Sequence, residues 1–117
     1  MNWISRLVLV LTLFSSFPVA ANPVYRINTG GGAYTDSLGQ AWVADTGFNT
    51  GNAFTTSSPI AGTPDPILYQ SERWDSSSAP ELLYSLAVSP GTYTVRLHFA
   101  NIYSGTSQVG QRVFDVN

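Results

Sequence analysis

The strongest pattern in the chain is the strict alternation of apolar and polar residues from Thr92 to Ala100, with Tyr93, Val95, Leu97 and Phe99 on the apolar side. Successive side chains of a strand point to opposite faces of a sheet, so this alternation is typical of a half-buried β-strand. A second alternating run, Leu82–Val88, precedes it, and Pro90-Gly91 stands between them where a type II turn requires these residues. The two runs therefore predict a β-hairpin.

The remaining strand-like segments are shorter and are separated by loops. They are residues 24–28, 41–44, 67–74 and 111–116. Proline disfavours the helical region for the residue before it, so Asp65-Pro66 would stop any helix. The apolar and aromatic residues that follow, up to Trp74, predict a strand that leads into a surface loop. Thr46–Thr63 follows neither the strand nor the helix period and predicts a long loop. Since no useful helical period follows residue 21, the predicted fold class is all-β, most simply a β-sandwich.

The N-terminal segment has the parts of a secretory signal peptide. Arg6 supplies a positive charge, Leu7–Phe14 is an apolar run, and small residues end at Ala21. The alternative is an uncleaved membrane anchor, but the apolar run is shorter than the roughly 20 residues that span a bilayer. We therefore predict a signal peptide at residues 1–21 and one exported, secreted or periplasmic domain at residues 22–117, without membrane contact after cleavage.

Composition excludes several classes of function. The chain has no cysteine, which excludes a disulfide framework and a thiolate metal site. Clusters of histidine and carboxylate residues at metal-ligand spacing are also missing, so no metal or other cofactor is predicted. A net charge of −2 without any lysine argues against nucleic acid as a partner. Charged residues make up only 10% of the chain, so its neutral polar surface suits a neutral polar ligand.

Two short motifs each have a functional and a structural interpretation. Gly30-Gly31-Gly32 could cradle a phosphate, but the helix and lysine that such a loop needs do not follow, so a tight turn is favoured. Asp36 could bind calcium, but no further carboxylates follow at the spacing of a calcium loop. We expect Asp36 to accept hydrogen bonds from its own turn.

Catalytic residues are sparse. The one histidine, His98, lies in the predicted second strand, and no serine stands in a Gly-x-Ser-x-Gly elbow. A glycosidase needs two carboxylates that flank a bond. The nearest candidates are Glu72 with Asp75 and Asp65 with Asp115. Because Glu72 adjoins Arg73, we expect these two residues to form a structural ion pair, and the chain is predicted not to be an enzyme.

Aromatic residues in or beside loops favour binding instead. Sugar rings stack their C–H faces on aromatic rings, while their hydroxyl groups need polar partners. Phe54, Trp74 and Tyr103 fall in or beside predicted loops, with Ser, Thr, Asn and Gln nearby. Tyr69 adds a fourth ring in the segment that leads to Trp74. The sequence therefore favours a platform that binds an oligosaccharide or polysaccharide.

Three motifs together resemble the malectin family. They are Arg26-Ile27-Asn28 followed by Gly30-Gly31-Gly32, then Leu68-Tyr69-Gln70-Ser71-Glu72-Arg73, and Phe99-Ala100-Asn101-Ile102-Tyr103 with Arg112-Val113-Phe114-Asp115-Val116-Asn117. Residues 24–117 look like the first two-thirds of such a domain. The resemblance implies a lectin-like β-sandwich of the jelly-roll or galactose-binding type, which binds glucose-containing oligosaccharides without catalysis. Because the chain stops within a strand-like pattern, we expect a domain that is truncated at its C-terminus and belongs to a longer protein.

The resemblance also implies where the ligand residues lie. Trp74 matches a position that is usually tyrosine, and Tyr103 ends the Phe-Ala-x-Ile-Tyr motif. Ser104 stands where phenylalanine is common, and Phe54 is the nearest match to a tyrosine of the long loop. The family's ligand aspartate comes from a C-terminal part that this chain does not contain. Protein or peptide recognition, as in malectin-like ectodomains of receptor kinases, is the alternative function.

Overall fold

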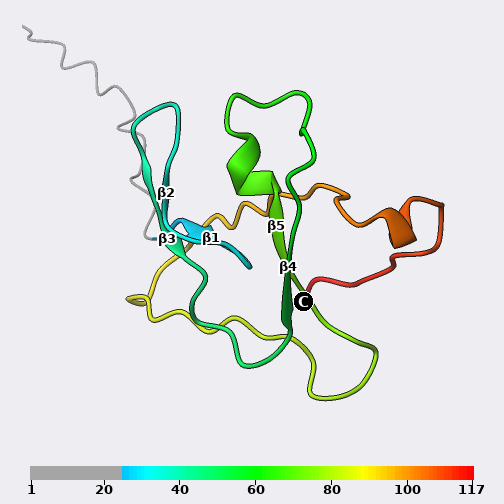
Figure 1. The fold of residues 1–117 in the computed structure, drawn as a ribbon. Coiled ribbons are helices and arrows are strands. Elements are labelled where there is room, and N and C mark those ends of the chain that lie inside the picture. The colour runs from blue at the N-terminus through cyan, green and yellow to red at the C-terminus, as the bar shows by residue number, and fades with distance from the viewer. Residues whose placement is uncertain (1–24) are drawn as a thin grey trace, which may run out of the picture.

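The computed structural model describes residues 25–117, and the predicted signal peptide at residues 1–21 lies outside them. The described residues form five short strands and two 3₁₀ turns, whose arrangement is drawn in Figure 1. The strands are β1 (Ile27–Asn28), β2 (Tyr34–Thr35), β3 (Ala41–Ala44), β4 (Asn52–Thr55) and β5 (Ser71–Trp74), and the turns are η1 (Pro66–Tyr69) and η2 (Ser104–Thr106). The prediction of an all-β fold is confirmed.

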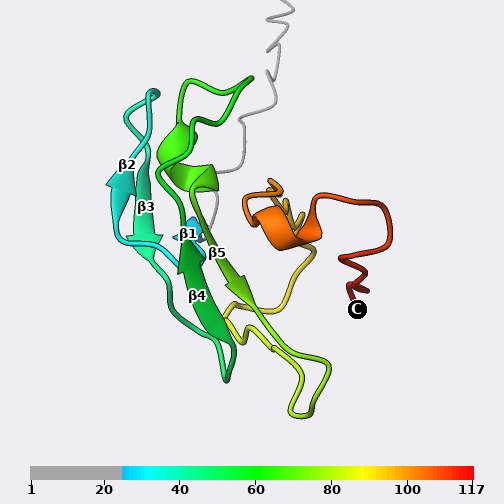
Figure 2. The same cartoon turned by 45° about the vertical axis from the view of Figure 1, so that its right-hand side comes forward.

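The strands form two small sheets. In the first, β3 lies in the centre, parallel to β1 and antiparallel to β2. In the second, β4 and β5 pair antiparallel along their whole length, so that Phe54 faces Glu72 and Asn52 faces Trp74. Figure 2 shows the strands together on one side and the segment that contains η2 on the other side of β5.

The turn between β2 and β3 is held by Asp36. Its Oδ1 accepts hydrogen bonds from the backbone N–H groups of Leu38 and Gln40, at 3.0 and 2.8 Å. Its Oδ2 accepts one from the indole Nε1 of Trp42 at 3.0 Å. Gly39 adopts a φ of 76° at the end of the turn, a conformation that glycine adopts without steric cost. The expectation that Asp36 stabilises its own turn is confirmed.

Two predictions around β4 and β5 need correction. Residues 46–63 are not a continuous loop, because β4 lies within them and is stabilised by its ladder with β5 rather than by its own period. Residues 67–74 are not one strand either, since η1 takes the first half. Pro66 stands in the first turn of η1, where its fixed φ suits a helix and its missing N–H costs nothing.

The predicted hairpin of Leu82–Val88 with Thr92–Ala100 is not formed. The first run instead lies along residues 47–49, where Ser85 N–H donates to Gly47 O at 2.8 Å and Asn49 N–H donates to Leu83 O at 3.1 Å. The Asn49 side chain adds a further bond from Leu83 N–H to its Oδ1 at 2.7 Å. These contacts hold one edge of the first run beside residues 47–49, and no pairing with residues 92–100 is formed.

The second run and the last segment have no ladder partner among the described residues. Residues 92–100 and 111–116 carry no strand pairing, so the strand predicted at 111–116 is also not formed. Their apolar side chains stay exposed, among them Val95, Leu97, Phe99, Phe114 and Val116. Within residues 25–117 no apolar residue is buried, and Asn28, which is 4% exposed, is the one buried polar residue.

No helix in residues 25–117 has the length and apolar character needed to cross a membrane.

Candidate functional site

One face of the β4–β5 ladder gathers three of the four aromatic residues singled out above. Directly opposed residues of a ladder share a face, as do residues two apart on a strand. Phe54 opposite Glu72, and Trp74 two residues further along β5, therefore lie on one face. Tyr103 packs against this face through Phe54, with ring centroids 5.4 Å apart and planes at 77°. We call Phe54, Glu72, Trp74 and Tyr103 the aromatic face.

The rings of the aromatic face are open to solvent. Trp74 is 42% exposed and Tyr103 is 48% exposed, while Phe54 is half-buried beneath Tyr103. Edge-to-face contact between aromatic rings is favourable and holds one ring against the other. Residues diagonal to one another across a ladder lie about 7–8 Å apart, within reach of large side chains, so Trp74 can act together with Phe54.

The position of Tyr103 depends on a glycine. Tyr103 has extended backbone angles at the start of η2, and its ring folds back over Gly105. A Cβ at residue 105 would collide with the ring carbon Cε1 of Tyr103. Gly105 therefore leaves the space that lets the ring reach the aromatic face.

Glu72 brings an ion pair to the same face. Arg112 donates from Nη1 to Glu72 Oε2 at 2.7 Å and from Nη2 to Glu72 Oε1 at 3.0 Å. This bond to Glu72 raises the pKa of Arg112. The pair ties the segment after η2 to β5 and remains partly exposed, with 32% of the Arg112 side chain open.

The opposite face of the ladder holds a second ion pair. Arg73 Nε donates to Asp45 Oδ2 at 2.6 Å, and its guanidinium carbon lies 3.4 Å from the centre of the Phe48 ring. Asp45 also accepts from Gly30 N–H at 2.8 Å and, through Oδ1, from the Tyr84 hydroxyl at 2.8 Å. Burial and the bond to Asp45 raise the pKa of Tyr84.

The predicted ion pair between Glu72 and Arg73 is therefore wrong. Neighbouring side chains of a strand point to opposite faces, so the two residues cannot both turn toward each other without leaving the ladder. Glu72 pairs with Arg112 and Arg73 pairs with Asp45 instead. This arrangement places one ion pair on each face of β5.

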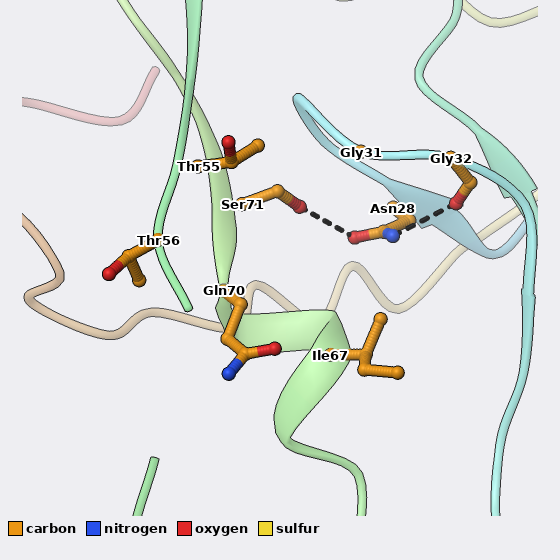
Figure 3. Close-up of a pocket in the computed structure, with 8 residues that line it drawn as sticks. All are labelled: Asn28, Gly31, Gly32, Thr55, Thr56, Ile67, Gln70 and Ser71. Atoms are coloured by element: carbon orange, nitrogen blue, oxygen red, sulfur yellow. Dashed lines mark hydrogen bonds between the residues drawn. The ribbon is translucent and has the colours of Figure 1, made fainter. Parts of the chain in front are cut away.

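A small cavity lies beneath the glycine turn, at the end of β4 and β5 (Figure 3). Its volume is about 180 Å³, smaller than the pockets of roughly 300 Å³ and more that hold drug-sized ligands. In Figure 3 the amide of Asn28 points between Ser71 and Gly32, and it donates to Gly32 O at 2.9 Å and accepts from Ser71 Oγ at 3.1 Å. The hydrogen bonds of the Asn28 amide at this cavity are structural, and the bond from Ser71 links β1 to β5.

The glycine run behaves as a turn. Gly31 N–H donates to Asn28 O at 3.0 Å, and Gly30 has a φ of 71°. A Cβ at Gly30 would overlap the backbone carbonyl of Glu72, and one at Gly31 would lie 2.5 Å from Ser71 Oγ. Close approach to β5 therefore requires glycine here, which agrees with the tight-turn interpretation.

Tyr69 lies against different partners from the other three aromatic residues. Its hydroxyl bonds to His98 Nδ1 at 3.0 Å, and the two rings meet edge to face at 5.9 Å. The His98 ring also meets Trp42 at 5.7 Å. Tyr69 lines an open cavity of about 230 Å³ together with residues 60–63, Phe99 and Ala100. The predicted ligand residues thus fall into a group of three and a separate tyrosine.

Sequence reasoning missed the polar residues that organise both faces. Arg112 and Asp45 lie far in sequence from the residues they pair with, and no local pattern indicates these pairings. The available signal was the excess of acids over bases in a chain with few charges, which makes each arginine a probable partner of a carboxylate. Within residues 25–117 no group of three or more histidine, aspartate or glutamate side chains is placed to hold a metal ion.

The described residues form an all-β domain that carries an exposed aromatic face. A family model for the Malectin domain matches residues 23–117, and the chain therefore belongs to the Malectin domain family. It is 48% identical over 50 residues to Receptor-like protein 4 of Arabidopsis thaliana, an alignment that covers 42% of this chain and 8% of that protein. The chain thus corresponds to less than a tenth of that relative. No solved structure matches it significantly.

Proposed function

We propose that this domain binds carbohydrate without catalysis, and that its ligands are glucose-containing oligosaccharides held on the aromatic face. The observation that carries the proposal is the convergence of Phe54, Trp74 and Tyr103 on one face of β4–β5. These residues come from three separate parts of the chain. The choice of glucose as the ligand sugar rests on the family resemblance.

The chemistry of this face suits a neutral sugar ring. An exposed indole and an exposed phenol offer flat apolar surfaces on which sugar C–H groups stack. The Tyr103 hydroxyl supplies a polar group at the edge of these surfaces. A site of aromatic walls with a few polar groups is the usual composition of a small-molecule site.

The proposal includes export of the domain from the cytoplasm. The signal peptide predicted at residues 1–21 would deliver the domain outside the cytoplasm, as a module of a longer secreted or periplasmic protein. Polysaccharides are available as ligands in that location, and nucleic acid is not a partner of so acidic a chain.

A glycan panel tests the function. The mature chain, with its folded state verified by circular dichroism, is applied to immobilised neutral, acidic and amino-sugar oligosaccharides. We expect saturable binding to glucose-containing members, and loss of that binding when Trp74 is changed to alanine. A folded chain that binds no member of the panel would reject the proposal.

Recognition of a protein or peptide is the second candidate. It is favoured by Ser104, which stands beside Tyr103 where the family commonly has an aromatic residue, and by the similarity to a receptor-like protein. This candidate predicts that Ser104→Phe leaves partner binding unimproved. The carbohydrate function predicts that Ser104→Phe raises sugar affinity about two- to tenfold, the effect of one added aromatic contact.

A further inference from the structure

We propose that the Glu72–Arg112 ion pair is the polar half of the sugar site and binds two adjacent hydroxyl groups of a neutral pyranose. This inference rests on the proposed function and goes beyond it, because it assigns a role in ligand recognition to a pair that otherwise only ties two segments together. It names the ligand chemistry as a vicinal diol rather than an anionic sugar.

The position of the pair follows from the ladder register. Glu72 lies directly opposite Phe54, and Trp74 follows two residues later on the same face. The Cβ atoms of directly opposed residues lie about 4.5–5.5 Å apart. A sugar ring stacked on the rings of the aromatic face would therefore have its edge beside the ion pair.

The hydrogen-bonding capacity of the pair matches a diol. Arginine has five N–H donors, and two of those of Arg112 are bonded to Glu72. Each carboxylate oxygen of Glu72 accepts one of these bonds and keeps a further lone pair. A hydroxyl group both donates and accepts, so adjacent hydroxyls can use the remaining acceptor of one residue and the remaining donor of the other.

The charge of the pair favours a neutral ligand. The guanidinium of Arg112 is already matched by the carboxylate of Glu72 in a two-bonded pair, so the pair carries no net charge. Binding an acidic sugar would require the guanidinium to exchange one carboxylate for another. A neutral diol binds at the edge of the intact pair. The partial exposure of both side chains, 32% for Arg112 and 15% for Glu72, leaves this edge open.

Calorimetric titration with a set of deoxy sugars tests the proposal. The probes are methyl glucoside or a glucose disaccharide and its analogues, each lacking one hydroxyl group. The proteins are the wild type, Glu72→Gln and Arg112→Lys. The Arg112→Lys variant keeps the positive charge but loses the planar two-bonded geometry of the guanidinium. The wild type should lose about tenfold in affinity for one or two adjacent deoxy analogues, since a hydrogen bond to a charged group is worth at least that.

The two variants should each bind the parent sugar about tenfold more weakly and should no longer discriminate against those same analogues. If both variants bind the parent sugar weakly but lose as much affinity for the deoxy analogues as the wild type does, the pair has only a structural role. That result would reject the proposed diol contact and leave the proposal of sugar binding standing. If Glu72→Gln does not fold, the Arg112→Lys comparison decides by the same criterion. If the wild type binds no sugar, both the proposed function and the proposed diol contact are rejected.

Discussion

Replacing Asp45 should destabilise the domain more than any other single charge change. Asp45 is the shared acceptor of Arg73, Gly30 and Tyr84, at 2.6 to 2.8 Å, and its side chain is only 7% exposed. The Asp45→Ala variant leaves the Arg73 guanidinium, 10% exposed, without its carboxylate. Removing one partner of a buried pair costs about 3–5 kcal/mol, because the remaining charge stays desolvated.

The more exposed ion pair provides the matched control for this comparison. Glu72→Gln removes a carboxylate from a pair in which Arg112 is 32% exposed, and such pairs are worth about 1 kcal/mol or less. In urea titrations followed by tryptophan fluorescence, the free energy of unfolding falls by about 2 kcal/mol per M of urea, so Asp45→Ala should lower the unfolding midpoint by about 2 M. Glu72→Gln should lower it by about 0.5 M or less on the same slope. Equal losses in the two variants would refute the argument from burial.

Three further predictions concern the two turns and the position of Tyr103. Gly30→Ala and Gly39→Ala both place alanine at a positive φ, 71° and 76°, but only the Cβ at residue 30 would meet the backbone of β5. Gly30→Ala should therefore lower the free energy of unfolding in urea by ~2 kcal/mol more than Gly39→Ala does. Equal losses of stability would contradict the close approach of residue 30 to β5. The turn lowers the pKa of Asp36, first through the bond from the Trp42 indole, below its usual 3.8. Its stabilising effect is therefore complete above about pH 4 and is lost as pH falls through the lowered pKa. The difference in stability between wild type and Asp36→Asn should narrow below pH 4, and a constant difference down to pH 2 would contradict this. Gly105→Ala should displace the Tyr103 ring and weaken sugar binding about tenfold without removing any ring atom. Unchanged affinity in calorimetric titration would show that sugar binding does not depend on the position of the Tyr103 ring over residue 105.

Local patterns predicted the two N-terminal turns and the fold class correctly. The turn residue Asp36 accepts the bonds from its own turn that an aspartate at such a position commonly accepts. The glycine run forms a tight turn because its residues must approach β5. The all-β class follows from the absence of a helical period, a property that survives errors in individual strands.

Long-range pairing was not predictable in the same way. Alternation shows that Thr92–Ala100 can be a strand, but it does not name a partner. Leu82–Val88 found its partners at residues 47–49, where the Asn49 side chain adds a bond that no periodicity reveals. The sequence did not predict the strand β4, because four residues are too few to show a strand period. These residues form a strand because each of them pairs with a residue of β5.

The same distinction applies to the site. Residue type alone singled out Phe54, Trp74 and Tyr103 as rings near loops, and the structure brings them to one face. Residue type did not distinguish Tyr69 from these three residues, because the local sequence does not show that its hydroxyl bonds to His98. Arg112 was overlooked because its partner lies 40 residues away.

The most direct test of the account is calorimetric titration of the folded, mature chain with a glucose disaccharide, in the wild type and in Trp74→Ala and Tyr103→Ala. Tyr93→Ala is the control, since Tyr93 is exposed to a similar degree, 43% against 48% for Tyr103, and its hydroxyl bonds within its own turn, to Ser89 O. We expect saturable binding in the wild type and in the control, and a loss of affinity of at least about tenfold in each site variant. Wild-type affinity in both site variants would contradict the claim that the aromatic face is the sugar site.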